Sequence, residues 1–425
     1  MDRFERDTQY WKFSLYGFLK NLRFFDPYLL LFFCEMGISY TLIGVLFSIR
    51  AIVTNFMEIP SGIIADTFGR RKSMIFCFIS YIFSFMLFYL FPYYWVYIIA
   101  MVFFAFGEAF RTGTHKAMIL EHLRLKGLLH LKADYYGHTR GWSQTGSALS
   151  AALGAVMVFY SGNYRIVFLF SIIPYIMGLF LMISYPKELD FSVEDGRMPL
   201  NEPLAWKKQL LHSFTSLKVS ISSKELRRGI LNFSMFDGLF KTIKDYLQPI
   251  IEQLALTAPL FLAFSGKQRS ALLIGIVYTL MFLLTSTASR SAGRIKHILH
   301  QTERGLNASF ILGAVVISIA GFSYISGNLY IAVAAFVIYY MIKNVRGPLT
   351  VDYLSDRFES SVMATGLSGE SQVKSLVTAI MAPLFGLAVE REGLGITLVV
   401  FGIFLFLMAI LLQLAAKKSR EDADE

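Results

Sequence analysis

Charged residues are scarce in this sequence. Only 16% of its 425 residues are Asp, Glu, Lys or Arg, compared with roughly 25% in soluble globular domains. Hydrophobic residues make up 55% of the chain, and Phe alone occupies 40 positions. A soluble core does not need this much apolar mass, so the composition argues against a soluble protein and predicts a chain embedded in a membrane.

The sequence also lacks the patterns that mark most enzymes and metal-binding proteins. Its two cysteines, Cys34 and Cys77, have no metal-site spacing, and we interpret them as packing residues. We find no Gly-rich phosphate loop, no zinc pattern and no Ser/His/Asp arrangement, which predicts no catalytic residues, no metal and no cofactor. The opening residues MDRFERDTQYWK carry acids and no small-residue cleavage site, so we expect no cleavable signal peptide.

The apolar residues occur in runs of about 20, the length that crosses a hydrocarbon layer of about 30 Å as a helix. These runs predict an all-α membrane protein with twelve transmembrane helices. The predicted spans are 11–33, 42–64, 73–92, 94–117, 141–160, 165–185, 229–251, 270–288, 306–325, 328–350, 366–389 and 394–415.

The net charge of +10 follows a topological pattern. Basic residues gather in loops on the cytoplasmic side of membranes. If both termini are cytoplasmic, the outer loops contain few basic residues, namely Arg165, Lys267, Arg269 and Arg391. This bias predicts cytoplasmic termini and an integral protein of a bacterial inner membrane in contact with lipid. It also removes the reason to expect a nucleic-acid partner.

One long polar segment divides the spans into two groups of six. Residues 187–228 form a predicted cytoplasmic connector between bundles at 1–186 and 229–425. Within the connector, Leu210, Phe214, Leu217 and Ile221 recur at helical spacing beside lysines. This pattern is consistent with a short helix lying on the inner leaflet, and an ordinary solvated linker explains it equally well.

The two halves carry matching short patterns in the same order. Residues 17–23 read GFLKNLR, and residues 238–244 read GLFKTIK. Residues 69–72 (GRRK) match 293–296 (GRIK), and residues 141–144 (GWSQ) match 369–372 (GESQ). Three matches at nearly constant offset predict a duplicated six-helix unit, and hence two pseudo-symmetric bundles of the kind found in transporters.

The segment after the second predicted span reads GIIADTFGRRK, residues 62–72. It resembles the loop signature of the major facilitator superfamily (MFS), a family of secondary transporters that move solutes by alternating access. Thr67 stands where the family often has Arg or Lys. The span count, the repeat and the connector extend the resemblance over the whole chain. The matching residues are Gly62, Asp66, Gly69, Arg70 and Arg71.

The resemblance implies a gating role for these five residues. In the family this loop holds the cytoplasmic side closed against the second half, which places Asp66 near residues 365–369. The alternative is that the basic residues of the loop only anchor the protein at the headgroup level.

Basic residues inside the predicted spans suggest a solute site. A charge facing lipid costs roughly 2.5–3.5 kcal/mol, so these side chains should face a hydrated cavity or their partners. The resemblance adds that spans one, four, seven and ten line the family's cavity. We predict binding of an anionic solute by Lys20, Arg23, Arg111, Lys241, Lys244 and Arg346. Interhelical latches are the alternative role for each of them.

Other charged residues in the spans have simpler interpretations. Lys116, Arg140 and Lys343 lie near cytoplasmic ends, where their side chains can extend to water, and we expect His115 to be exposed. Spacings of three or four residues on one helix predict ion pairs. The predicted pairs are Arg23–Asp26, Glu108–Arg111, Lys241–Asp245 and Glu370–Lys374.

Coupling to a proton gradient requires a carboxyl group that titrates in the working range, which burial favours. The candidates are Glu108, Glu58, Asp237 and Glu370, with Glu108 first. The predicted function is therefore a monomeric secondary transporter of a small anionic organic solute, coupled to protons or to exchange.

Three alternatives remain open from sequence, one of which is a receptor with the same fold that transports nothing. The first is proton-coupled efflux of amphipathic drugs, although residues 146–157 lack the Pro-Gly core that family antiporters often carry in span five. The second is a membrane-embedded enzyme that uses the histidines at 115–138, whose spacing does not form a ligand set.

Overall fold

The described part of the chain is helical throughout. The computed structural model describes residues 6–191, 224–299, 301–357 and 360–414, without the side chains of residues 133, 289–299 and 356–368. These residues form no strand. The connector helix predicted around Leu210–Ile221 lies outside the described residues.

Contacts divide the chain into two compact units. The first unit comprises Met1–Leu210 and Ala255–Phe282, and the second comprises Leu211–Leu254 and Leu283–Glu425. The first unit thus includes a segment from beyond residue 229. The predicted bundles at 1–186 and 229–425 remain a prediction.

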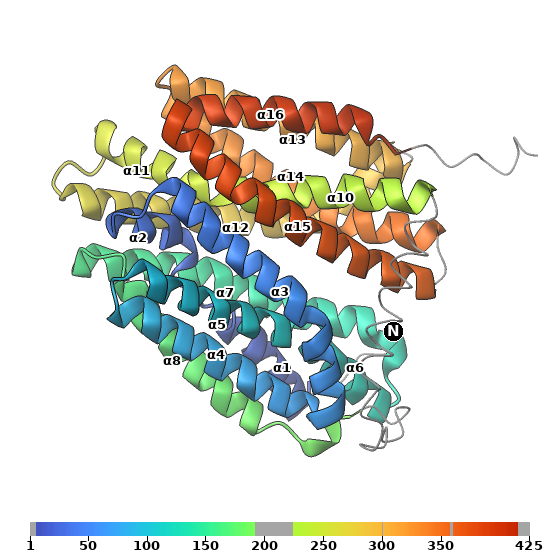
Figure 1. Ribbon diagram of the computed structural model, residues 1–425. Coiled ribbons are helices and arrows are strands. Elements are labelled where there is room, and N and C mark those ends of the chain that lie inside the picture. Colours follow the sequence, from blue (N-terminus) through green and yellow to red (C-terminus); the bar gives the residue numbers. More distant parts are fainter. Residues whose placement is uncertain (1–5, 192–223, 300, 358–359, 415–425) are drawn as a thin grey trace, which may run out of the picture. The chain divides into compact units, whose positions relative to one another are not determined.

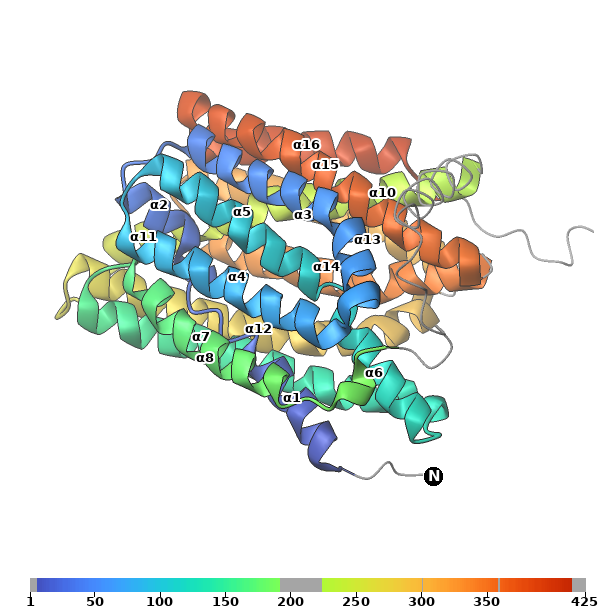
Figure 2. The same cartoon turned by 60° about the horizontal axis from the view of Figure 1, so that its bottom comes forward.

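The first unit contains α-helices, which Figure 1 labels, and short 3-10 helices, named η. They are α1 (Thr8–Leu19), η1 (Asp26–Tyr28), α2 (Leu29–Glu35), α3 (Tyr40–Phe68), α4 (Arg70–Leu90), α5 (Tyr94–Arg111), α6 (Thr114–Leu125), η2 (Leu129–Leu131), α7 (Lys132–Ser161), α8 (Ile166–Ile183) and η3 (Lys187–Leu189). Within this unit α4 packs against α5 and α8, α3 packs against α5, and α1 packs against α7. Figure 2 shows α4 and α5 side by side.

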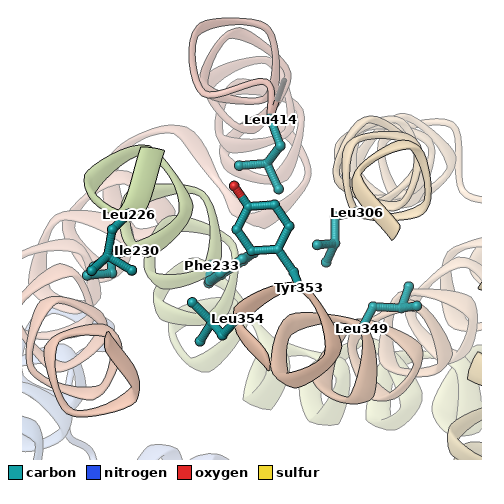
Figure 3. Close-up of a cluster of buried hydrophobic side chains, with 8 residues drawn as sticks. All are labelled: Leu226, Ile230, Phe233, Leu306, Leu349, Tyr353, Leu354 and Leu414. Carbon is teal, nitrogen blue, oxygen red and sulfur yellow. The ribbon is translucent and has the colours of Figure 1, made fainter. Parts of the chain in front are cut away.

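The second unit holds most of the remaining helices. They are α10 (Lys224–Ile243), η4 (Lys244–Tyr246), α11 (Leu247–Thr257), α12 (Gly266–Leu299), α13 (Thr302–Ile325), α14 (Leu329–Arg357), α15 (Ser360–Glu392) and α16 (Leu394–Leu411). The ends of α11 and α12 that fall in 255–282 belong to the first unit. Helix α13 packs against α14 and α16, and α10 packs against α15. Figure 3 shows part of this core, where side chains from α10, α13 and α14 surround Tyr353 together with Leu414.

Among the described residues, nine helices are long and apolar enough to span a membrane. They are Tyr40–Phe68, Arg70–Leu90, Tyr94–Leu125, Ile166–Ile183, Gly266–Ala288, Thr302–Ile325, Leu329–Ser355, Gly369–Glu392 and Leu394–Leu411. The protein is therefore an integral membrane protein, and the count of twelve spans stays a prediction.

Two of the predicted spans are broken helices. The first consists of α1, η1 and α2, because the chain leaves the α-helix at Lys20 and resumes it at Leu29. The seventh consists of α10, η4 and α11, with a 3-10 turn at Lys244–Tyr246. Both breaks fall on or directly beside the basic residues of the matched stretches GFLKNLR and GLFKTIK.

The two units also repeat one helix contact. In the first unit a Cβ on Gly17 of α1 would lie 2.8 Å from the Ser143 hydroxyl of α7. In the second unit a Cβ on Gly238 of α10 would lie 2.6 Å from the side chain of Val377 in α15. Because a glycine lets two helices approach closely, the repeated glycine explains why α1 packs on α7 as α10 packs on α15.

Candidate functional site

A cavity of about 390 Å³ lies inside the first unit. Its walls come from the end of α1, the junction of α5 and α6, the first turns of α6, and the middle of α7. Its volume is near the lower end of the range of about 300–1,000 Å³ that ligand pockets occupy. A small solute therefore fits it.

The cavity walls carry four basic side chains. Lys20, Arg111, Lys116 and Arg140 line it, and the described lining residues include no Asp or Glu. Lys20 and Arg111 are half-buried, whereas Lys116 and Arg140 are exposed. Most of the remaining lining is aromatic, hydroxyl or amide in character, and the rest is Gly17, Gly113, His115 and Ile119. We call this site the basic cavity.

The basic cavity forms where two helices end. Helix α5 ends at Arg111, and Thr112 is in an extended conformation with ψ 123°. Gly113 then takes φ +81°, in the region that glycine adopts without steric cost. This break turns the chain so that α6 starts at the cavity wall, with Thr112, Gly113, His115 and Lys116 all lining it.

The inner basic pair is held by tyrosines. The Lys20 ammonium lies 5.4 Å from the ring centre of Tyr16, within cation–π range. The Nε of Arg111 donates to the Tyr81 hydroxyl at 3.4 Å. Both of these partners are neutral aromatic side chains.

Arg23, another predicted solute residue, belongs to an adjacent ion-pair network and does not line the cavity. Its guanidinium lies 3.6 Å from Asp26, which confirms that predicted pair, and 3.4 Å from Glu108. Glu108 lies 3.6 Å from Arg50 as well. The network joins the segment between α1 and η1, η1 itself, α3 and α5. The Phe104 ring lies within cation–π distance of both arginines.

In the second unit, basic side chains of the spans lie beside carboxylates. Lys343 is 2.9 Å from Asp237, and Lys374 is 3.0 Å from Glu370, which confirms the predicted Glu370–Lys374 pair. Lys244 pairs with the adjacent Asp245, and Lys241 is exposed.

Glu58 of the first unit is half-buried in α3. These carboxyl groups remain candidates for proton coupling.

Arg346, another residue of the predicted solute set, is enclosed within the second unit. Its side chain is only 1% exposed within the second unit. It donates to Ser309 and Asn232 at 2.9 and 2.8 Å and to the Leu306 carbonyl, and it stacks over Phe236. These contacts join α10, α13 and α14. A guanidinium enclosed in this way ties helices together, which favours the interhelical latch, the alternative role for this residue.

The signature loop is anchored inside the first unit. Gly69, with φ +105°, separates α3 from α4. The Arg70 and Arg71 amides donate to the Asp190 carbonyl and carboxylate, and Asp66 lies 3.9 Å from Arg70. Gly62 has open space around it. The predicted contact of Asp66 with residues 365–369 stays a prediction, because the side chains of 365–368 lie outside the described part.

Three Lys, Arg or His residues of the cavity wall were not predicted to belong to a site. Lys116 and Arg140 were expected to extend to water, and both line the cavity. His115 was expected to be exposed, but it is 9% exposed, stacked on Tyr16 at 3.6 Å and hydrogen-bonded to the Tyr185 hydroxyl. A signal existed for the first two, because helices that break at Gly113 bring the start of α6 next to α7.

The described residues contain no group of three or more His, Cys, Asp or Glu side chains able to hold a metal ion. The histidines at 115–138 do not assemble into a ligand set in this part of the chain.

Comparisons with known proteins agree on one family. The chain is 22% identical over 405 residues to "Uncharacterized MFS-type transporter YxaM" of Bacillus subtilis (strain 168), covering 94% of this chain and 93% of that protein. Among solved structures, the nucleoside transporter NupG has a TM-score of 0.71 at 12% identity, covering 96% of this chain and 98% of that one. The xylose transporter XylE from E. coli has a TM-score of 0.68 at 15% identity, covering 97% of each chain.

The structural neighbours show the fold, since their sequence identities are low. The family model described as Major Facilitator Superfamily matches residues 21–369, which is most of the chain. Its members are transporters and not enzymes. With the broken helices, the repeated unit and the membrane-spanning helices described above, this match shows that the chain belongs to the major facilitator superfamily of membrane transporters.

Proposed function

We propose that this transporter moves a small anionic organic solute by alternating access, with the solute bound at the basic cavity. The observation that supports this proposal is the composition of the wall, in which Lys20, Arg111, Lys116 and Arg140 occur without an acidic residue among the described lining. A positive cavity with low-dielectric walls attracts and concentrates anions. Arg and Lys are also the side chains that bind carboxylate and phosphate groups.

Coupling to protons or to exchange is the second part of the proposal. Glu108 is the preferred proton site because it lies between Arg23 and Arg50. Protonation of its carboxyl would release both arginines from their ion pairs, and the network could then rearrange. One structural neighbour is a D-xylose–proton symporter, so proton coupling is compatible with this fold. We also propose a monomer in a bacterial inner membrane with both termini cytoplasmic.

A thermal-shift screen tests the anionic solute. The purified full-length protein is heated with succinate, inorganic phosphate, xylose, uridine or tetraphenylphosphonium at constant ionic strength, because salt screens exposed charges. We expect an anion to raise the melting temperature and Arg111→Gln to abolish the rise. Lys132→Gln is the matched control, because Lys132 is a cation of the first unit that does not line the cavity.

The same screen distinguishes transport of an anionic solute from the alternative, efflux of amphipathic cations. If tetraphenylphosphonium stabilises the protein and no anion does, the anionic solute is wrong and efflux of amphipathic cations is favoured. If Arg111→Gln and Lys132→Gln reduce the anion effect equally, the anion binds outside the basic cavity.

A further inference from the structure

The four cations of the basic cavity form two pairs at different depths. Lys20 and Arg111 are half-buried at the inner wall, and Lys116 and Arg140 are exposed. The inner pair contacts the neutral Tyr16 and Tyr81, as described above. Carboxylates of the neighbouring network lie against other arginines, with Glu108 beside Arg23 and Arg50.

A single negative charge balances this wall poorly. Four cations around about 390 Å³ repel one another, and the repulsion grows as solute displaces water and the local dielectric falls. A monocarboxylate would neutralise only one of them. A solute group with two negative charges gains more from the same wall, because each charge interacts with every cation.

The start of α6 favours a compact dianion over two separate charges. The first backbone N–H groups of a helix have no partner inside the helix and bind anions. Helix α6 has 12 residues and starts after Gly113, which provides no side-chain cap. A Cβ placed on Gly113 would meet nothing within 4 Å, so a ligand can approach this backbone. Arg111 and Lys116 flank the same turn.

Other parts of the wall suit the rest of such a solute. Asn21, Thr139, Ser143 and Gln144 provide hydroxyl and amide groups, and Phe13 and Tyr136 provide aromatic surface. Amides and hydroxyls form hydrogen bonds with solute hydroxyl groups, and aromatic faces cover carbon skeletons. The wall therefore fits a small hydroxylated body attached to a charged head.

From this arrangement we infer that the solute is a phosphate monoester, bound through its dianionic phosphoryl group by Arg111, Lys20 and the first turn of α6. This inference rests on the proposed function, because it specifies which anion the basic cavity takes. A phosphate monoester carries a charge of roughly −1.5 to −2 at pH 7 and three acceptor oxygens. Its oxygens match the fork of a guanidinium and the N–H groups of a helix start.

A matched pair of probes tests the inference. Ethyl phosphate is dianionic at pH 7.5, whereas diethyl phosphate contains the same phosphorus group with one negative charge. Titration calorimetry of the purified full-length protein at constant ionic strength measures both, with acetate and succinate alongside. We expect ethyl phosphate to bind at least tenfold more tightly than diethyl phosphate, acetate or succinate.

Variants then locate the binding group. Arg111→Gln should reduce the preference for ethyl phosphate over diethyl phosphate to less than threefold, whereas Lys132→Gln should leave it unchanged. Arg111→Lys keeps the positive charge and loses the paired N–H donors of the guanidinium. It should therefore give an intermediate preference for ethyl phosphate over diethyl phosphate. If Arg111→Gln does not fold, Lys20→Gln and Arg111→Lys provide the same comparison.

The outcomes distinguish failure of the phosphate-monoester inference from failure of the proposed function. If all four anions bind equally, or succinate binds most tightly, the phosphate monoester is wrong and anion binding at the basic cavity still stands. If no anion binds and a neutral solute such as xylose does, the proposed function is wrong as well. If the preference is present but survives Arg111→Gln and Lys20→Gln together, the phosphoryl group lies elsewhere and the inference is overturned.

Discussion

Glu108 occupies a position between two guanidinium groups. Its carboxylate lies 3.4 Å from Arg23 and 3.6 Å from Arg50, and all three side chains are about one-fifth exposed, at 19% for Glu108 and 23% for each arginine. One carboxylate thus offsets two partly buried cations. Removing a partner from such a pair leaves uncompensated charge, which costs more than the pair itself contributes.

Glu108→Gln should therefore destabilise the first unit. We expect a loss of about 2 kcal/mol, since the buried-pair penalty is reduced by the remaining exposure. Thermal unfolding of the purified variant measures the loss as a lower melting temperature. The double variant Glu108→Gln, Arg50→Gln should recover part of it, because Arg50 is then gone and Arg23 keeps Asp26 as its partner. A melting temperature equal to that of the parent protein would show that the network contributes nothing to stability.

Arg346 provides a contrasting prediction for the second unit. Arg346→Met should cost about 3 kcal/mol, because it leaves the side-chain oxygen of the buried Asn232 without its donor. The protein that remains folded should bind anions as the parent does, since the basic cavity lies in the first unit. Melting temperature and calorimetry check the two parts. Loss of anion binding with normal stability would restore Arg346 to the solute set.

At the scale of elements, glycines set how closely α1 approaches α7. A Cβ on Gly146 of α7 would lie 2.5 Å from the backbone oxygen of Phe18, and one on Gly154 would lie 3.1 Å from that of Phe24. Backbone atoms cannot move aside as a flexible side chain can. This contact holds the broken end of α1 at the cavity wall.

Gly146→Ala should consequently separate the two helices and destabilise the protein by about 1–3 kcal/mol. Gly141→Ala is the matched control, because Gly141 lies in the same helix and a Cβ there meets nothing within 4 Å. In a helix this control substitution is neutral or stabilising by up to about 1 kcal/mol. Melting temperatures compare the two. Equal effects would mean that the close approach of α1 and α7 is not required.

The helices could be predicted from sequence more completely than the site. Runs of apolar residues mark most of the helices, because hydropathy depends on composition alone. The breaks at Lys20 and Gly113 were not predicted, because the predicted spans 11–33 and 94–117 run through them. Helical spacing places Glu108 and Arg111 on one face, but it does not reveal that Arg23 and Arg50 lie against Glu108. The enclosure of Arg346 depends on α10 and α13, which are distant in sequence.

At the scale of the whole molecule, the two units share an architecture and differ in charge. The α1–α7 contact of the first unit recurs as α10–α15 in the second, which supports the predicted duplication. In the first unit the basic cavity has no acid among its described lining residues, whereas in the second Lys343 and Lys374 lie beside Asp237 and Glu370. We expect the first unit to determine which solute is recognised.

Transport by the complete protein should depend on that cavity. In sealed proteoliposomes loaded with ethyl phosphate, labelled ethyl phosphate should enter faster than in protein-free liposomes and leave chemically unchanged. Lys20→Gln and Arg111→Gln should each reduce this exchange at least tenfold, because the inner pair loses one of two charges. Lys132→Gln should transport at the parental rate. If neither Lys20→Gln nor Arg111→Gln changes the exchange rate, transport does not depend on the basic cavity.

The central claim is that the basic cavity of the first unit binds an anion. Anomalous X-ray scattering from crystals soaked in arsenate, a heavier analogue of phosphate, locates the anion directly. We predict an anomalous peak inside the cavity, within hydrogen-bond distance of Arg111 and Lys20, that disappears in Arg111→Gln crystals. An ordered arsenate elsewhere in the protein, with the cavity empty or filled by a neutral solute, would contradict the claim.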